Sequence, residues 1–443
     1  MFQSFIFALT LFSYLAFSYY FAVRINKEKF LSLWLIFFLV SILLSVEILG
    51  AFNVFSASGL LIFALINLGI ILLLELRNIN KLGKLNLHNI VFDSKGIPVF
   101  IILFVLTFLV ILYNELSPLT EIDSIAYHLP IVSNLISTNG VWEVFHAGFT
   151  GPNTFFPANH EAIQAFFAVL TGNMNFGFVV NLLAFLLLLT SLFDLGNKKI
   201  SKLFSFIIAL CCISVPFLFN QFLNLQIDLF MFCLFSSGVA LMVSSVISND
   251  KFDLLKGFLV LGIMLGAKYN SVPQIIVLIP FFIFLFIYHR KSFKSIFWHP
   301  FIILLPGIFW YIRNWIIAGN PIYPFGLNLG FINFEGHKDI IAGTVGTSLW
   351  DLMMKDGFSG VFNHIFNHSE FGAQLGEISL VLFPAAIFTL LSFEPLSAII
   401  TSAFIPIRCI ALWLFLITIG SVFSSFRHGI TIERSFGIYF MLS

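Results

Sequence analysis

Long apolar runs, separated by short polar segments, cover most of the chain. Many of them exceed about 17 residues, the shortest helix that normally crosses a bilayer. The predicted spans are 4–23, 30–50, 55–76, 97–113, 174–193, 203–219, 227–247, 255–270, 271–288, 299–317, 377–393 and 397–422, and another begins near 430. The pattern therefore predicts an all-α polytopic membrane protein with about 12–13 transmembrane helices.

Two details of this map depend on charge and on local chemistry. The apolar stretch 255–288 has basic residues on both flanks, so we divide it into two spans at Lys268 to Ser271, which keeps both flanks on one side of the membrane. The first run, 4–23, lacks a basic segment before it and a small-residue cleavage site after it. We expect it to be a retained helix rather than a removed signal peptide.

Composition supports a membrane location and narrows the classes of partner. The 443 residues are 59% hydrophobic and 10% charged, which is more apolar surface than a water-soluble core can bury. The formal net charge of +1 gives no reason to expect a nucleic acid partner. All of the cysteines, Cys211, Cys212, Cys233 and Cys409, lie within apolar runs. We interpret them as small buried hydrophobic residues rather than as disulfides or zinc ligands.

The basic residues predict which side of the membrane each loop faces. Of the 22 Lys and Arg residues, 15 lie in alternate loops, at 24–29, 77–95, 198–202, 251–256 and 290–294. The positive-inside rule makes these loops cytoplasmic. The large loops 114–173 and 318–376 are then external, and the first of them contains five carboxylates and no Lys or Arg.

Ionisable residues are concentrated in the sequence EIDSIAYHLP at the start of the first external loop. Thr120 followed by Asp123 resembles a capping box, so we expect a short helix that stops or kinks at Pro130. Helical spacing would place Tyr127 on the face of Asp123, with His128 beside it. The alternative is that these residues only cap a helix and expose a solvated carboxylate.

Three later ionisable residues are predicted at the same outer level of the membrane. Asp228 follows a short external turn, Lys268 lies at a junction of two spans, and Arg313 lies near the outer end of 299–317. Charges at such depths are costly unless they face a protein interior or a wet cavity, although a lysine or arginine can also snorkel to the head groups. Carboxylates and cations at one depth suit transfer of a sugar from a lipid phosphate, because the cations stabilise the leaving phosphate while a carboxylate activates an acceptor hydroxyl.

A divalent metal is a second interpretation of the first external loop. His128, His160 and Glu161 lie in it and form a feasible ligand set, although no H-x-x-x-H or H-E-x-x-H spacing is present. Further histidines in the second large loop are more simply loop residues. No phosphate-binding loop of the Walker type occurs, which argues against a nucleotide-driven pump.

Four motifs together resemble a known family. In chain order they are EIDSIAYHLP, FPANHEAIQAFFAVLTGN, LGIMLGAKYNS and RNWIIAGNPIYPF. At these separations they resemble the bacterial membrane glycosyltransferases of the GT-C superfamily, in particular the family-39-like, phospholipid-carrier-dependent enzymes related to protein mannosyltransferases and lipid A aminoarabinose transferases. The resemblance covers roughly 97–330. It implies a GT-C-like fold, an outward-facing active site in the bacterial inner membrane and a polyprenyl-phosphate-linked sugar as donor.

The resemblance also implies roles for particular residues. It points to Asp123 as the catalytic base with Glu121 as the alternative, and to Arg313 and Lys268 as the groups that bind the donor phosphate. The further residues that it places at the substrate are Tyr127, His128, Asp228, Asn320 and Tyr323.

The chain departs from the family pattern in two ways. Relatives often carry adjacent acids in the first loop, whereas Ile122 separates Glu121 from Asp123 here. Three additional predicted spans, 4–23, 30–50 and 55–76, precede the one that leads into that loop. We therefore expect 1–95 to be an N-terminal transmembrane addition and 96–443 to be the catalytic membrane domain.

The sequence leads to one main hypothesis and two alternatives. In the main hypothesis the protein moves a sugar from a polyprenyl-phosphate carrier to an acceptor hydroxyl on a lipid, glycan or protein at the outer face of the membrane. A flippase or transporter for lipid-linked sugars would place charges near the bilayer midplane or on both sides of the membrane. A glycan ligase or polymerase would share both the outward-facing site and the lipid donor.

Overall fold

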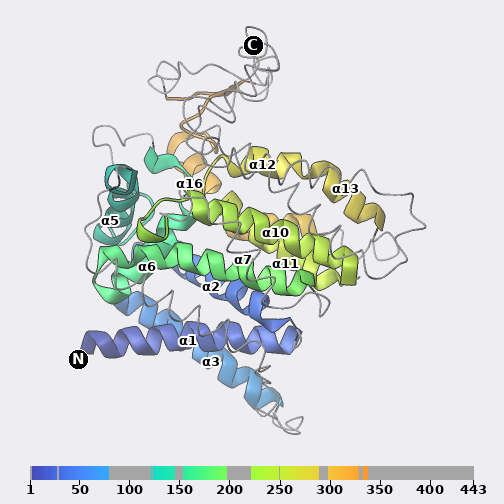
Figure 1. Cartoon of the computed structure of the whole chain (residues 1–443). Coiled ribbons are helices and arrows are strands. Elements are labelled where there is room, and N and C mark those ends of the chain that lie inside the picture. The colour runs from blue at the N-terminus through green and yellow to red at the C-terminus, as the bar shows by residue number, and fades with distance from the viewer. Residues whose placement is uncertain are drawn as a thin grey trace. The chain divides into compact units, whose positions relative to one another are not determined.

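The computed structural model describes residues 2–26, 29–78, 121, 123–144, 153–196, 221–248, 250–288, 298–328 and 333–337. Within these ranges the chain is almost entirely helical (Figure 1). The single pair of strands found there, β1 (Leu327–Asn328) and β2 (Asn333–Phe334), forms an antiparallel hairpin. The predicted all-α membrane fold is confirmed.

Several described helices are long and apolar enough to cross a membrane. Of these, five stand alone, and a sixth candidate is a pair of helices bent by 59°. The five are α1 (Phe2–Ile25), α2 (Phe30–Ala51), α3 (Ala57–Asn78), η6 (Met174–Phe178) continued by α7 (Val179–Gly196), and α10 (Asp228–Ser248). They agree with the predicted spans at the same positions. The predicted spans 97–113, 203–219, 377–393 and 397–422, and the one near 430, lie outside the described residues.

The remaining described helices are shorter. They are η4 (Ser124–His128), α5 (Leu129–Ser137), α6 (Asn159–Thr171), η7 (Gln221–Leu223), α11 (Lys251–Leu265), α12 (Ser271–Val277), α13 (Ile279–Tyr288), η9 (His299–Ile303), α15 (Leu304–Gly307) and α16 (Phe309–Ala318). The predicted division near Lys268 is confirmed, because α11 ends at Leu265 and α12 begins at Ser271.

The predicted span 299–317 is not one straight helix. It consists of η9, α15 and α16, and the bend falls between Gly307 and Phe309. Pro306 has no N–H for the helical hydrogen bonds, and the glycine after it adds backbone freedom. A bend at this point is the expected consequence, and it sets the direction in which α16 carries Arg313.

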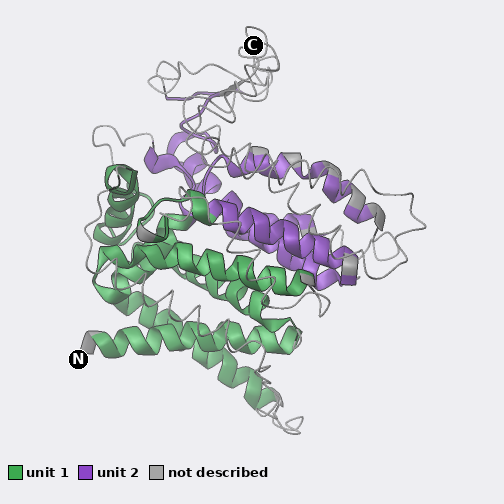
Figure 2. Cartoon of the chain, in the orientation of Figure 1, with its two compact units in different colours: residues 1–145, 160–210, 221–230 green, residues 146–159, 211–220, 231–443 purple. Residues whose placement is uncertain are grey.

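The chain divides into two compact units (Figure 2). Unit 1 comprises 1–145, 160–210 and 221–230, and unit 2 comprises 146–159, 211–220 and 231–443. Unit 1 thus contains the three N-terminal helices as well as η4, α5 and nearly all of α6. Whether 1–95 and 96–443 are separate domains stays a prediction.

In unit 1, α2 is the most enclosed of the three N-terminal helices. It packs against α1, α3 and α7, and its apolar side chains, such as Ile36, Leu39 and Ile42, are fully buried. By contrast, α3 exposes large apolar side chains along its length, including Ile62, Leu65, Leu72 and Leu73. Such a surface suits contact with lipid rather than with water.

The turn between α2 and α3 holds the segment that follows α5. The backbone N–H of Phe55 donates to the carbonyl of Asn139 at 2.9 Å, and that of Val141 donates to the carbonyl of Gly50 at 3.2 Å. The indole of Trp142 donates to the carbonyl of Ala51 at 2.8 Å. The N-terminal helices therefore support the segment 114–173, which carries the candidate base.

In unit 2, glycines bring the helices close together. A Cβ on Gly257 of α11 would lie 2.9 Å from the carbonyl oxygen of Gly238 on α10. A Cβ on Gly262 would lie 2.4 Å from the carbonyl oxygen of Ile303, and one on Gly307 would lie 2.7 Å from that of Gly262. Small residues permit this approach, which is a common basis of helix packing in membranes.

Candidate active site

The first acid of EIDSIAYHLP caps the helix that follows it. Glu121 accepts hydrogen bonds from the backbone N–H groups of Asp123 at 2.9 Å and Ser124 at 2.7 Å, and from the Ser124 hydroxyl at 2.8 Å. A fourth bond comes from the side-chain amide of Gln226 at 2.7 Å. Both carboxylate oxygens are thus engaged, and the bonds to the two backbone donors satisfy N–H groups at the start of a helix.

This geometry corrects one detail of the predicted helix. The helix does not stop at Pro130, because η4 passes directly into α5, which runs to Ser137. Pro130 is the second residue of α5, so a residue without an N–H lies where the helical segment continues. The structure changes from π- to α-helical spacing just before the proline. The predicted cap at Thr120 lies outside the described residues.

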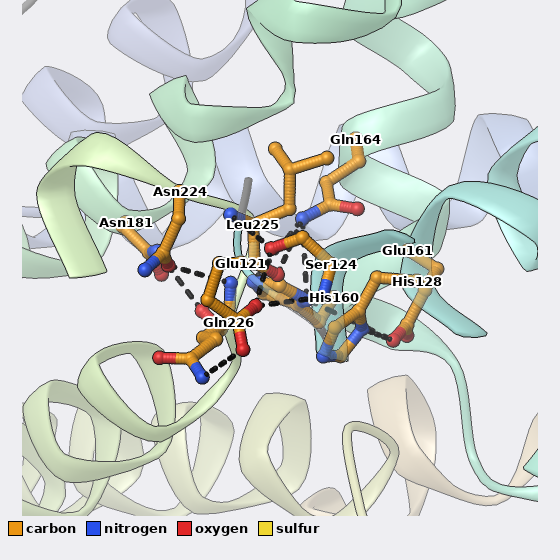
Figure 3. A network of polar contacts seen from close by, with 10 residues as sticks. All are labelled: Glu121, Ser124, His128, His160, Glu161, Gln164, Asn181, Asn224, Leu225 and Gln226. Atoms are coloured by element: carbon orange, nitrogen blue, oxygen red, sulfur yellow. Dashed lines mark hydrogen bonds and ion pairs between the residues drawn. The ribbon is translucent and has the colours of Figure 1, made fainter. Parts of the chain in front are cut away.

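A loop distant in sequence completes the surroundings of Glu121 (Figure 3). The Ser124 hydroxyl accepts a bond from the backbone N–H of Leu225 at 3.1 Å, so that this side chain joins Glu121 to the loop. Asn181 of α7 donates to the carbonyls of Gln221 and Gln226 at 2.7 and 3.0 Å. The loop and the start of η4 therefore form one hydrogen-bonded network.

A buried cluster of two histidines and a carboxylate lies beside this network. His128 Nδ1 and Glu161 Oε1 are 2.5 Å apart, and His160 Nδ1 lies 3.8 Å from the same oxygen. The amide of Gln164 lies 3.4 Å from His160 Nδ1 and donates to the carbonyl of Leu225 at 3.2 Å. Figure 3 shows this chain of contacts from Glu121 through Ser124 and Gln164 to Glu161.

Burial and hydrogen bonding act in opposite directions on Glu161. Burial raises the pKa of its carboxyl, but hydrogen bonds from His128 and His160, together with their charges, outweigh burial and hold the pKa below its ordinary value. The carboxylate is therefore the form that this environment favours.

The other candidates of unit 1 lie at the edge of the network. Asp123 is half-buried at the start of η4, and Tyr127 is half-buried with its ring 4.1 Å from that of His128. Asp228 begins α10 and accepts a bond from Gln221 at 3.2 Å, while Gln221 accepts one from the backbone N–H of Leu229 at 2.6 Å. Asp228 thus takes part in holding the start of its helix.

The candidate cations lie in unit 2. Arg313 of α16 is buried, donates to the carbonyl of Thr154 at 2.7 Å, and lies over the ring of Trp310 at 5.1 Å. Its Nε has no hydrogen-bond partner among the described residues. Lys268 is half-buried, and its backbone carbonyl accepts from the Ser271 hydroxyl at 2.5 Å.

The motif RNWIIAGNPIYPF ends in a turn, and hydrogen bonds from polar groups of this turn hold its backbone. Asn320 is buried and donates to the carbonyls of Phe325 and Glu335 at 2.7 and 3.0 Å. The carbonyl of Tyr323 accepts from the Tyr269 hydroxyl at 2.7 Å. The Asn320 side chain therefore serves the turn itself, while the Tyr323 ring is half-buried against Phe155.

The structure brings Tyr127, His128, His160 and Glu161 into contact, and it divides the other predicted site residues between the two units. Unit 1 holds Glu121, Asp123, Tyr127, His128, His160, Glu161 and Asp228, and unit 2 holds Lys268, Arg313, Asn320 and Tyr323. A shared site of the carboxylates of unit 1 and the cations of unit 2 stays a prediction.

Sequence reasoning missed the amides that organise both units. Gln226 and Gln164 complete the network of unit 1, and Asn159 links several elements of unit 2. The sequence did contain a signal for them, because each is an uncharged polar residue within an apolar motif. Membrane proteins bury such a residue only when it has a hydrogen-bond partner.

A comparison with known protein families found a match to part of the chain. Residues 157–312 match the family model of dolichyl-phosphate-mannose-protein mannosyltransferases. The match supports a GT-C superfamily glycosyltransferase. It includes Glu161, Asp228 and Lys268, and it excludes both Asp123 and Arg313. The comparisons with curated proteins and with solved structures found no match.

Proposed function

We propose that this membrane glycosyltransferase moves a sugar from a polyprenyl-phosphate carrier to an acceptor hydroxyl at the outer face of the membrane, with Asp123 as the general base. The family match supports the transferase chemistry, and the absence of Lys and Arg from 114–173 supports the outward orientation of this segment. The acceptor is a lipid, glycan or protein hydroxyl.

The proposal rests on the different surroundings of Glu121 and Asp123. Glu121 accepts four hydrogen bonds from the protein, which engage both of its carboxylate oxygens. A carboxylate used in this way is a poor acceptor for a substrate proton. Asp123 is the next acid along the chain and is half-buried at the same helix start. In the proposed mechanism Glu121 positions this helix start, and Asp123 takes the proton.

The proposed leaving group requires positive charge. As the acceptor oxygen attacks the anomeric carbon, the bond to the carrier phosphate breaks and negative charge develops on the phosphate oxygen. Arg313 would bind this phosphate through its planar fork, and Lys268 would contribute a compact second charge. Both residues belong to motifs on which the resemblance to these enzymes rests, LGIMLGAKYNS and RNWIIAGNPIYPF.

The test compares two neighbouring acids in one assay. Purified protein in lipid nanodiscs is incubated with a panel of polyprenyl-phosphate sugars, and the released carrier lipid is measured for wild type, Asp123→Asn and Glu121→Gln. We expect Asp123→Asn to lower kcat/KM by at least about 100-fold, as loss of a general base does. Glu121→Gln should keep measurable turnover while lowering thermal stability, because an amide replaces a carboxylate that accepts four hydrogen bonds.

A third variant and three outcomes complete the test. Glu143→Gln is the matched control, since Glu143 belongs to the same acidic segment and its side chain is exposed. Wild-type turnover by Asp123→Asn would exclude Asp123 as the base. Movement of intact donor across vesicles without release of carrier would favour a flippase instead. Extension of a glycan still linked to its own carrier would favour a polymerase.

A further inference from the structure

The buried cluster of His128, His160 and Glu161 has the composition of a metal site. One ligand atom from each residue can be chosen so that all three lie within 4.8 Å of one another. His160 and Glu161 are adjacent at the start of α6, and His128 ends η4, so two separate helical segments contribute. Figure 3 shows the His128 and Glu161 side chains directed at each other.

One oxygen atom of the cluster is buried without a hydrogen-bond partner among the described residues. His128, His160 and Glu161 are 0%, 0% and 4% exposed, so the carboxylate charge is removed from water. Glu161 Oε2 has no hydrogen-bond partner among the described residues, although Oε1 faces both histidines. A buried carboxylate oxygen without a partner is costly, and a cation would use it.

The spacing is close to that of a coordinated ion. Zinc lies about 2.0–2.2 Å from nitrogen and oxygen ligands, so that tetrahedral ligands are separated by about 3.3–3.6 Å. The present separations extend from 2.5 Å between His128 and Glu161 to a limit of 4.8 Å for the set. The spacing expected around a zinc ion falls within this range, and His128 of η4 is already in contact with Glu161 of α6.

The donor atoms favour one class of ion. Two imidazoles and one carboxylate suit Zn²⁺ and similar transition metals, whereas Mg²⁺ and Ca²⁺ prefer oxygen ligands alone. Gln164 contacts His160 and is anchored on the carbonyl of Leu225, so it can fix the orientation of that imidazole.

We infer that His128, His160 and Glu161 bind a Zn²⁺-class divalent cation that fastens η4 to α6. His128 follows Asp123 by five residues within one continuous helical segment, so the ion holds the segment that carries the candidate base. Its place in a buried cluster assigns it a structural role. The inference does not depend on the proposed glycosyl transfer, because metal binding can be measured without any sugar donor.

Metal content and ligand type test the inference directly. Full-length protein, purified without an affinity tag, is treated with a chelator, reloaded with Zn²⁺, Mn²⁺ or Mg²⁺, and analysed by mass spectrometry for bound metal. We expect about one Zn²⁺ per chain, little Mg²⁺, and a rise of the thermal midpoint with Zn²⁺ by mass action. Glu161→Gln and His160→Gln should bind Zn²⁺ at least tenfold more weakly, and His337→Gln, in the second external loop, should bind as wild type does.

Co²⁺ provides a readout on the wild-type chain, which guards against variants that fail to fold. Visible absorption and X-ray absorption should show nitrogen and oxygen ligands, including two imidazoles, and no sulfur. A sulfur-to-metal charge-transfer band would show that cysteines bind the ion, and it would overturn the inference. The inference would also be overturned if wild-type protein retained less than about one tenth of an equivalent of Zn²⁺, or if the ligand variants retained as much Zn²⁺ as wild type.

Discussion

At the scale of single residues, the two acids of EIDSIAYHLP have different surroundings although they are two positions apart. Glu121 accepts four hydrogen bonds and organises the local backbone, while Asp123 is half-buried beside it. From the sequence, both acids were candidates for the catalytic base. The distinction depends on Gln226, which is 105 positions away from Glu121 and contacts it only in the folded chain.

Asn159 in unit 2 is a second residue whose role depends on partners that are distant in the sequence. Its amide donates to the carbonyls of Ile263 at 3.0 Å and Pro306 at 2.7 Å, and its oxygen accepts from the Trp310 indole at 2.8 Å. Its backbone N–H donates to the carbonyl of Gly266 at 2.8 Å. The side chain of Asn159 thus links three elements of unit 2, namely α11, α15 and α16.

We predict that Asn159→Ala destabilises the protein by about 1–3 kcal/mol, since it removes all three side-chain bonds and leaves the buried Trp310 N–H without its acceptor. Thermal unfolding in nanodiscs measures the effect. Asn333→Ala, at an exposed position of β2, should leave the midpoint unchanged. Equal stability of Asn159→Ala and wild type would contradict the role of this side chain.

At the scale of elements, helix packing in unit 2 depends on glycine. Gly257 approaches Gly238 so closely that a methyl group would lie 2.7 Å from Met242 Cγ and 2.9 Å from the Gly238 carbonyl oxygen. Gly69, on α3 of unit 1, has no atom within 4 Å of the corresponding position. The same residue type is therefore required at one site and replaceable at the other.

We predict that Gly257→Ala lowers stability by about 1–3 kcal/mol through overpacking against the Gly238 backbone, which cannot move as a side-chain end can. Gly69→Ala should change stability by less than about 1 kcal/mol, because the added methyl group meets open space. Denaturation of both variants under identical detergent conditions checks the difference. A larger loss for Gly69→Ala than for Gly257→Ala would refute this packing argument.

At the scale of the whole molecule, the N-terminal helices and the first external loop share a unit. The turn between α2 and α3 binds the backbone of Asn139 and Val141 and the indole of Trp142, so the loop depends on helices that precede it by many residues. This contact gives residues 1–78 a structural purpose. It also requires the α2–α3 turn and the loop to lie on the same side of the membrane.

We predict from this topology that Glu143→Cys reacts with a membrane-impermeant maleimide in intact cells. Phe252→Cys, at the start of α11, should react only after permeabilisation, because it lies in a basic and hence cytoplasmic loop. Both positions are exposed, so access to the reagent differs only by side. The native cysteines are replaced in the background chain. Labelling of both variants from the same side would contradict the assignment of sides.

The sequence by itself determined the fold class, most of the described spans and the acidic character of the segment 114–173. These features follow from hydropathy over about 20 neighbouring residues and from the positions of Lys and Arg, which are local properties of the chain. The break of 255–288 near Lys268, which was inferred from the charged flanks, is also present, although the predicted span 271–288 consists of two helices, α12 and α13. Whether 255–288 crosses the membrane twice stays a prediction.

Only the tertiary structure decided which polar groups act together. His128 meets Glu161 across 33 positions, and Ser124 meets Leu225 across 101. It also showed that η4 runs into α5 through Pro130 and that α15 and α16 meet at a bend. A buried polar group must find a partner, but the sequence does not specify which one, because the partner is chosen by how the helices pack.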